Sequence, residues 1–377
     1  IIGGTGLQTT GGDAPIQLTR AAGNLTLNED ITANGAGNLS ITLSGAGAAL
    51  ITDNNADDIA SATGDVSITA DTLTLASGTI SSTGGALTLQ PNAASRSIGL
   101  GDNAGGDFNL NATELGLLSN GFGSITIGQT NSGAVDINAF TFLDPVTIQG
   151  AAMTVTGLQA GSNNITLTSS STIDEDVDDD TTDITTSGTL TLNAQGDIGQ
   201  SGGSGPLDIN VGDLVAHVTV NAGGIFINDI GGLTLTDVDT VDGNIDVSSS
   251  GAIVATDVHA MSNVTLSGTS VTLTSVTADD AGTVTVTATS GTIDEASDNN
   301  DTNITTTGQL NLSATAAIGA SGATGALDIS VGTLQASTAA GGVFLRESNA
   351  LIIGGTGLQT TGGDAPIQLP LAAGNLT

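Results

Sequence analysis

The sequence contains no cysteine, tryptophan, tyrosine or lysine, and only 6 phenylalanines among its 377 residues. Because aromatic side chains are this scarce, a globular core built on large anchoring rings is not expected. The absence of cysteine means that the fold does not rely on disulfides, which suits an extracellular protein held by extended hydrogen bonding but is equally compatible with a cytosolic one. No run of 18 apolar residues occurs, so the sequence predicts no membrane span.

Positive charge is also nearly missing. Thirty-eight acidic residues face three basic ones, Arg20, Arg96 and Arg346, and the formal net charge is -35. A chain of this charge repels nucleic acid and anionic membranes at ordinary salt concentrations. Nucleic-acid binding is therefore excluded as a function.

What the sequence has instead is glycine and short β-branched runs. There are 55 glycines, and threonine, serine, asparagine and aspartate fill the intervals between valine, isoleucine and leucine. The mean hydropathy is +0.22, whereas disordered chains lack the apolar residues needed to offset the entropy of ordering. The chain is therefore expected to fold around small side chains.

The opening stretch IIGGTGLQTTGGDAPIQL returns near the other end. Residues 1–26 match residues 352–377 at 24 of 26 positions, differing only at Thr19/Pro370 and Arg20/Leu371. This predicts a tandem array with a period of 351 residues, in which 1–351 is one unit and 352–377 is the beginning of the next copy.

A finer period runs through residues 224–301, which divide into successive segments of about 20 residues each. Apolar residues recur at equivalent positions of successive segments, and we call each such set a column. One column is Ile225, Ile245, Val264 and Val284; a second is Leu233, Ile253, Val271 and Ile293; a third is Val238, Val258 and Val276. Within each segment apolar and polar residues alternate, which is the pattern of strands with one buried face.

Three columns per segment predict an all-β, parallel β-solenoid with about 20 residues and three short strands per turn. A helix is disfavoured by frequent glycine, and the Asn-Gly and Asp-Gly signals of a hairpin sandwich are too few. Residues 172–216 also match 292–336 at 25 of 45 positions, an offset of 120 that predicts six turns of 20. One 351-residue period would then contain about 17 or 18 turns and advance by roughly 85 Å.

The turn length and the phrases GTLTLNAQGDIG, GALDISVGTL and GDFNLNATELGLLSNGFGSITIG resemble the large secreted exoproteins of the filamentous-haemagglutinin kind and giant β-strand-repeat adhesins. The resemblance is one of repeat style and covers almost the whole chain. It implies a right-handed β-helix, export to the cell surface or the extracellular space, and a role in adhesion or an extracellular matrix. It carries no catalytic residues.

Two related acidic loops, TIDEDVDDDTTDI and TIDEASDNNDTNI, are candidate Ca²⁺ sites, because Ca²⁺ takes six to eight oxygen ligands from flexible carboxylate and carbonyl groups. No EF-hand loop or nonapeptide calcium repeat occurs, so acidic turns that keep a fibre soluble remain the alternative. ITDNNADDIA is a third acidic loop. The candidate ligands are Asp174, Asp176, Asp178, Asp180, Asp294, Asp298, Asn299 and Asp301.

The only histidines, His217 and His259, lie about two turns apart in the sequence and are interpreted as polar strand residues, because no third ligand type is evident beside them. Carboxylates are present in every turn, but none is singled out by an arginine, a histidine or an aromatic sugar platform. We therefore expect no enzyme activity and no required cofactor.

The sequence favours a structural, extracellular fibre protein whose partners are copies of itself, end to end. The alternative is an adhesin or binding module that uses one solenoid face or its acidic loops to hold carbohydrate, ice, another surface or a receptor, with Ca²⁺ as an optional ligand and surface glycans as partners.

Overall fold

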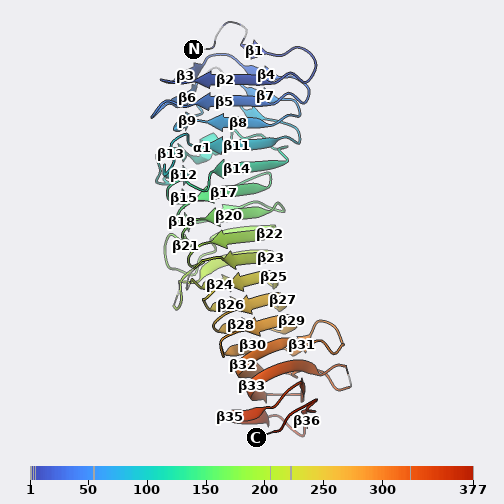
Figure 1. Ribbon diagram of the computed structural model, residues 1–377. Coiled ribbons are helices and arrows are strands. Elements are labelled where there is room, and N and C mark those ends of the chain that lie inside the picture. The colour runs from blue at the N-terminus through green and yellow to red at the C-terminus, as the bar shows by residue number, and fades with distance from the viewer. Residues whose placement is uncertain are drawn as a thin grey trace. The chain divides into compact units, whose positions relative to one another are not determined.

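The computed structural model describes residues 2, 4, 6–53, 56–203, 205–220, 223–322 and 324–376. In this part of the chain the fold is a parallel β-solenoid of about 16 turns with about 22 residues per turn, built from stacked strands (Figure 1). Every strand pairing within it is parallel, which confirms the predicted fold class. The chain divides into two compact units, which are residues 1–177 with 183–191 and residues 178–182 with 192–377.

In the first unit most turns contribute one short strand to each of three faces, and one turn contributes two strands to the second face. The first face contains β2 (Ile16–Arg20), β5 (Leu39–Leu43), β8 (Val66–Thr69), β11 (Ala86–Gln90), β14 (Ser124–Gly128), β17 (Val146–Gly150) and β20 (Ile165–Ser169). The second contains β3 (Leu25–Leu27), β6 (Ala49–Thr52), β9 (Thr72–Thr74), β12 (Ile98–Leu100), β13 (Phe108–Leu110), β15 (Val135–Ile137), β18 (Met153–Val155) and β21 (Ile173–Glu175). The third contains β1 (Leu7–Gln8), β4 (Ile31–Ala33), β7 (Ile59–Ser61), β10 (Ile80–Ser81), β16 (Phe140–Thr141), β19 (Leu158–Gln159) and the start of β22 (Ile184–Ala194).

One turn of the first unit carries a helix that the strand pattern does not predict. Helix α1 (Ala112–Leu115) lies between β11 and β14, in the long turn that leads from Leu87 to its partner Ile125. Its start is fixed by a capping box, in which Asn111 Oδ1 accepts from Glu114 N at 3.0 Å and Glu114 Oε2 accepts from Asn111 N at 3.0 Å.

In the second unit several strands are longer, because they continue from one face to the next. Its strands are β23 (Leu207–Val218), β24 (Ile225–Asp229), β25 (Leu233–Thr240), β26 (Ile245–Ser249), β27 (Ile253–Ala260), β28 (Val264–Gly268), β29 (Val271–Ala278), β30 (Val284–Ala288), β31 (Ile293–Glu295), β32 (Ile304–Ala314), β33 (Leu327–Thr338), β34 (Val343–Glu347), β35 (Ile352–Thr360) and β36 (Ile367–Gln368).

The predicted columns of the second unit are confirmed residue by residue. Ile225 pairs with Ile245, Ile245 with Val264, and Val264 with Val284. The columns that begin at Leu233 and Val238 pair in the same register. All these side chains are buried, and burial of a valine, leucine or isoleucine contributes about 1.5–3 kcal/mol. The stacked aliphatic columns are therefore the core.

Turn length is less regular than the sequence predicts. The step from Val284 to its partner Leu310 is longer than the step from Val264 to Val284, and the step from Leu310 to Leu334 is also longer. The expected turn length is therefore corrected to about 22 residues over the described chain, because turns that carry long loops take up the additional residues.

The 120-residue offset is not six turns. From Ile198, five successive pairings lead through Ile225, Ile245, Val264 and Val284 to Leu310. Ile318, the equivalent of Ile198 at this offset, lies beyond Leu310 and pairs instead with Ile293 and Val343. The offset is thus five turns and one further face, so equivalent residues of the two sub-repeats do not share a column.

The two copies of the repeated segment share backbone features at two turns, although their strands differ in length. Equivalent glycines have similar positive φ angles, 72° and 76° at Gly6 and Gly357 and 70° and 78° at Gly12 and Gly363. The first copy pairs with the turn that follows it, and the second with the turn that precedes it. Ile16 pairs with Leu39, whereas its equivalent Ile367 pairs with Val343. The other two faces repeat this relation: Leu7 pairs with Ile31 and Leu358 with Ala336, and Leu25 pairs with Leu50 and Leu376 with Leu351.

Candidate metal sites

The first acidic loop begins within a strand. Asp174 lies in β21 between the inward-facing Ile173 and Glu175, and its Oδ1 accepts from Glu175 N at 3.1 Å. Asp176 follows on the exposed surface of the first unit. Asp178 and Asp180 belong to the second unit and are exposed there.

The second acidic loop repeats this arrangement inside the second unit. Asp294 lies in β31 and accepts from Glu295 N at 3.0 Å, and burial raises its pKa. Asn299 and Asp301 are brought together: Asn299 Nδ2 donates to Asp301 Oδ2 at 3.1 Å, and Asp301 N donates to Asn299 Oδ1 at 2.7 Å. Asp298 is exposed beside them. These bonds order the loop internally and leave Ca²⁺ binding by it a prediction.

In the described residues, none of the eight candidate positions joins a group of three histidine or carboxylate side chains with ligand atoms within 4.8 Å.

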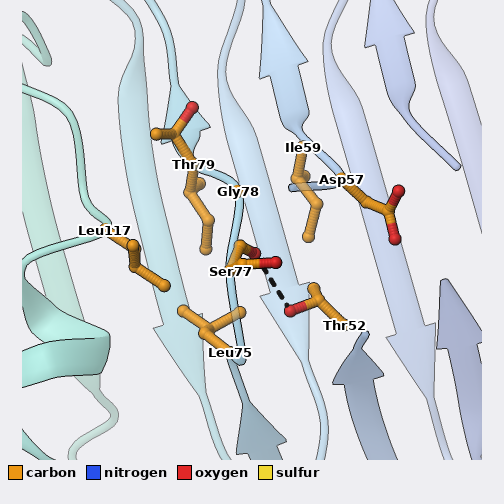
Figure 2. A pocket seen from close by; sticks show the side chains of 9 residues that line it. Thr52, Asp57, Ile59, Leu75, Ser77, Gly78, Thr79 and Leu117 are labelled. Atoms are coloured by element: carbon orange, nitrogen blue, oxygen red, sulfur yellow. Dashed lines mark hydrogen bonds between the residues drawn. The ribbon is translucent and has the colours of Figure 1, made fainter. Parts of the chain in front are cut away.

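The third acidic loop lies in the first unit, and its Asn54 and Asn55 fall outside the described residues. Asp57 is buried, and burial, followed by the nearby Asp53, raises its pKa to about 6. The adjoining small pocket is shown in Figure 2, where Leu75 and Leu117 lie together and the Asp57 carboxyl group points away from them. Thr52 Oγ1 donates to Ser77 O at 3.2 Å there. Residues packed this closely leave little room for a ligand.

A buried carboxyl pair beneath the second acidic loop was not predicted. Glu295 and Asp328 are 7% and 3% exposed, and burial, followed by the charge of Asp328, raises the pKa of Glu295 to about 7. Arg346 on β34 donates from Nε to Asp328 Oδ1 and from Nη1 to Asn300 Oδ1. Arg346 thus partly neutralises the buried carboxyl pair and links Asp328 to Asn300 in the second acidic loop. The sequence did contain a sign of this buried carboxyl group. Side chains alternate along β31, so Glu295 faces inward like Ile293 two residues before it.

The histidines have neighbours that sequence reasoning missed. His217 Nδ1 lies 3.1 Å from Asp239 Oδ2, and His217 Nε2 lies 3.7 Å from Asp237 Oδ2. His259 Nε2 lies 2.9 Å from Asp279 Oδ2. The spacing could have revealed these pairs, because each histidine is separated from its aspartate by one turn of the solenoid.

The first unit also has an apolar groove of about 240 Å³ between α1 and β16. Phe140 and Phe142 form an edge-to-face pair with ring centroids 5.0 Å apart, and Leu143 beside them is 56% exposed. Leu115 and Leu118 also line the groove. A groove with this apolar lining is suited to a small apolar ligand.

Comparison with protein-family models, with curated proteins and with solved structures gives no match for this chain. Among the described residues, no helix has both the length and the apolar character required to cross a membrane.

Proposed function

We propose that the protein is a structural element of an extracellular or cell-surface fibre, made of tandem 351-residue solenoid units. The observation that carries this proposal is the pairing of the repeated segment. One copy has a partner turn after it and the other has a partner turn before it, on all three faces.

Parallel strands at the end of a stack leave unpaired N–H and C=O groups, which form an edge open to further pairing. In a tandem array the repeated segment would have both of its partners, and no such edge would exist between units. Stacking would then continue through the join. The proposed role follows from this continuity: the protein supplies length and a repetitive, strongly acidic surface.

The proposal is tested by the length of chains that contain one, two and three 351-residue periods, imaged by electron microscopy. At about 22 residues per turn, a 351-residue period contains about 16 turns, and at about 4.8 Å per turn it would add roughly 77 Å per unit, somewhat less than the sequence alone suggests. Particles whose length does not increase linearly with unit number would contradict the fibre.

An adhesin is the second candidate, and the groove between α1 and β16 favours it. Repetition of this groove in every unit of an array would make the site multivalent, so a weak ligand could still give strong attachment. Binding of the chain to a glycan or surface panel, lost in Leu143→Asp and unchanged in the exposed Val241→Asp, would support this function over a purely mechanical one. An increase in the melting temperature of the chain with millimolar Ca²⁺ would indicate that the native protein binds Ca²⁺.

A further inference from the structure

The strongest cluster of ligating side chains outside the acidic loops is a ladder on one outer face of the second unit. His217 on β23 is in register with Asp239 on β25, which is in register with His259 on β27. All three positions alternate with buried residues, so their side chains face outward. Asp237 joins the ladder beside a register shift between β23 and β25, and such irregularities re-aim side chains.

Three of these residues meet the basic requirement of a metal site. Ligand atoms of His217, Asp237 and Asp239 all lie within 4.8 Å of one another. The imidazole is 25% exposed and the carboxylates are 48% and 43% exposed, so the group is open to an ion from solution. The ring of His217 lies between the two carboxylates, with one nitrogen toward each.

The donor set selects the class of ion. An imidazole nitrogen suits Zn²⁺, Cu²⁺ and Ni²⁺, whereas Ca²⁺ and Mg²⁺ prefer oxygen ligands alone. Open zinc sites with three protein ligands of the histidine and carboxylate type, completed by water, are well known. Zn²⁺ is the ion that fits this set without demanding planar geometry.

We propose that His217, Asp237 and Asp239 bind Zn²⁺, with one imidazole nitrogen, two carboxylate oxygens and water as ligands. Ligand atoms about 2.0–2.1 Å from a tetrahedral zinc ion lie roughly 3.3 Å apart, close to the 3.1 Å between His217 Nδ1 and Asp239 Oδ2. Asp237 Oδ2 lies 3.7 Å from the other ring nitrogen, Nε2, so the Asp237 side chain has to rotate to share an ion bound at Nδ1. The three ligand atoms lie within 4.8 Å of one another, and the Asp237 side chain is 48% exposed, which allows this rotation. The ion bridges β23 and β25 and therefore clamps two successive turns together.

The electrostatics of the cluster favour such an ion. Asp237 and Asp239 both approach the ring of His217. Two carboxylates that repel one another gain from a shared divalent cation. Within the described part of the chain, His259 and Asp279 join no group of three ligating side chains within 4.8 Å, and they form a pair at 2.9 Å.

The test is titration of the full chain with ZnCl₂ by calorimetry in millimolar Mg²⁺, which occupies non-specific carboxylate sites. We expect one zinc ion per chain and a higher melting temperature with zinc. His217→Ala and Asp239→Asn each remove a direct ligand and should weaken zinc binding on the order of 100-fold or more. Loss of a residue that only contacts a ligand already weakens metal binding by about 10- to 100-fold. Both variants should keep the wild-type circular dichroism spectrum, since the side chains lie on the surface.

His259→Ala is the matched control, because it removes the other histidine from the same ladder. It should retain zinc binding within a few-fold. Absence of saturable zinc binding by the wild-type chain would overturn the proposal, and so would an equal loss of binding in His217→Ala and His259→Ala. A fibre without zinc sites would leave the proposed structural role intact, so the two ideas fail separately.

Discussion

Arg346 on β34 donates from Nε to the carboxylate of Asp328 on β33, one turn earlier in the second unit. Asp328 is 3% exposed, and Arg346 is one of only three basic residues in the chain. A buried carboxylate that loses its cation remains uncompensated, which costs more than the ion pair itself contributes.

Replacement of this arginine is therefore expected to destabilise the second unit. Arg346→Met should lower the free energy of unfolding by about 2–3 kcal/mol, below the roughly 3–5 kcal/mol for a fully buried pair, because the arginine side chain is partly exposed. Thermal denaturation followed by circular dichroism measures the change. Arg20→Met is the control, since Arg20 is exposed. Equal effects of the two variants would mean that the Asp328 pair is not a stabilising contact.

The raised pKa values of two buried carboxyl groups, Glu295 and Asp57, predict how the stability of the protein depends on pH. The pKa of Glu295 is raised from 4.5 to about 7, first by burial and then by Asp328, and that of Asp57 is raised from 3.8 to about 6. Between about pH 4 and 7 the folded protein therefore binds more protons than the unfolded chain, so the free energy of unfolding falls as pH rises through this window. The melting temperature should be higher at pH 5 than at pH 8.

Glu295→Gln should raise the melting temperature at pH 8 by about a few degrees and make its pH dependence shallower. Asp301→Asn, in the exposed part of the same loop, should change neither. A melting temperature that increases from pH 5 to pH 8 would contradict this prediction, because it would show that Glu295 does not determine how stability changes with pH.

Close stacking of glycine turns predicts a steric effect. A Cβ atom at Gly251 would meet the backbone carbonyl of Gly231 on the preceding turn, whereas at Gly232 its nearest contact would be Ala252 O at 3.4 Å. Gly251→Ala should therefore destabilise the second unit by about 1–3 kcal/mol, and Gly232→Ala by much less. Urea denaturation of the two variants provides the comparison, and similar midpoints would contradict the tight inter-turn approach.

The fold could be predicted because a solenoid repeats one local rule. Alternation and the spacing of Ile225, Ile245 and Val264 determine strand, face and register together. Longer turns could not be predicted in this way, since a loop such as the one between Val284 and Leu310 is added without changing the columns. Helix α1 was missed because strand alternation surrounds it, although Asn111 and Glu114 have the spacing of a capping box.

Side-chain sites were harder to predict for the same reason. Acidic residues were grouped by their nearness in sequence, but a solenoid brings together residues one turn apart, such as His217 and Asp239. Arg346 and Asp328 belong to successive turns as well. Finding a site in this fold therefore requires both the composition of the loops and the register of the columns. The register is known only when the length of each turn is known.

The last prediction concerns Ile367, which is 43% exposed, whereas its equivalent Ile16 is 6% exposed. Ile16 has its following partner Leu39, and Ile367 has its preceding partner Val343. If the array continues, a chain extended beyond Thr377 with the sequence of residues 27–69 should bury Ile367 as fully as Ile16. Ile367→Ala should then cost about 2–4 kcal/mol in the extended chain, a value typical of a buried isoleucine, but about 1 kcal/mol or less in the chain that ends at Thr377. Hydrogen exchange of the β36 amides should slow in parallel. An unchanged cost and unchanged exchange after extension would mean that the second copy does not template the next turn, and the tandem-fibre proposal would fail at its join.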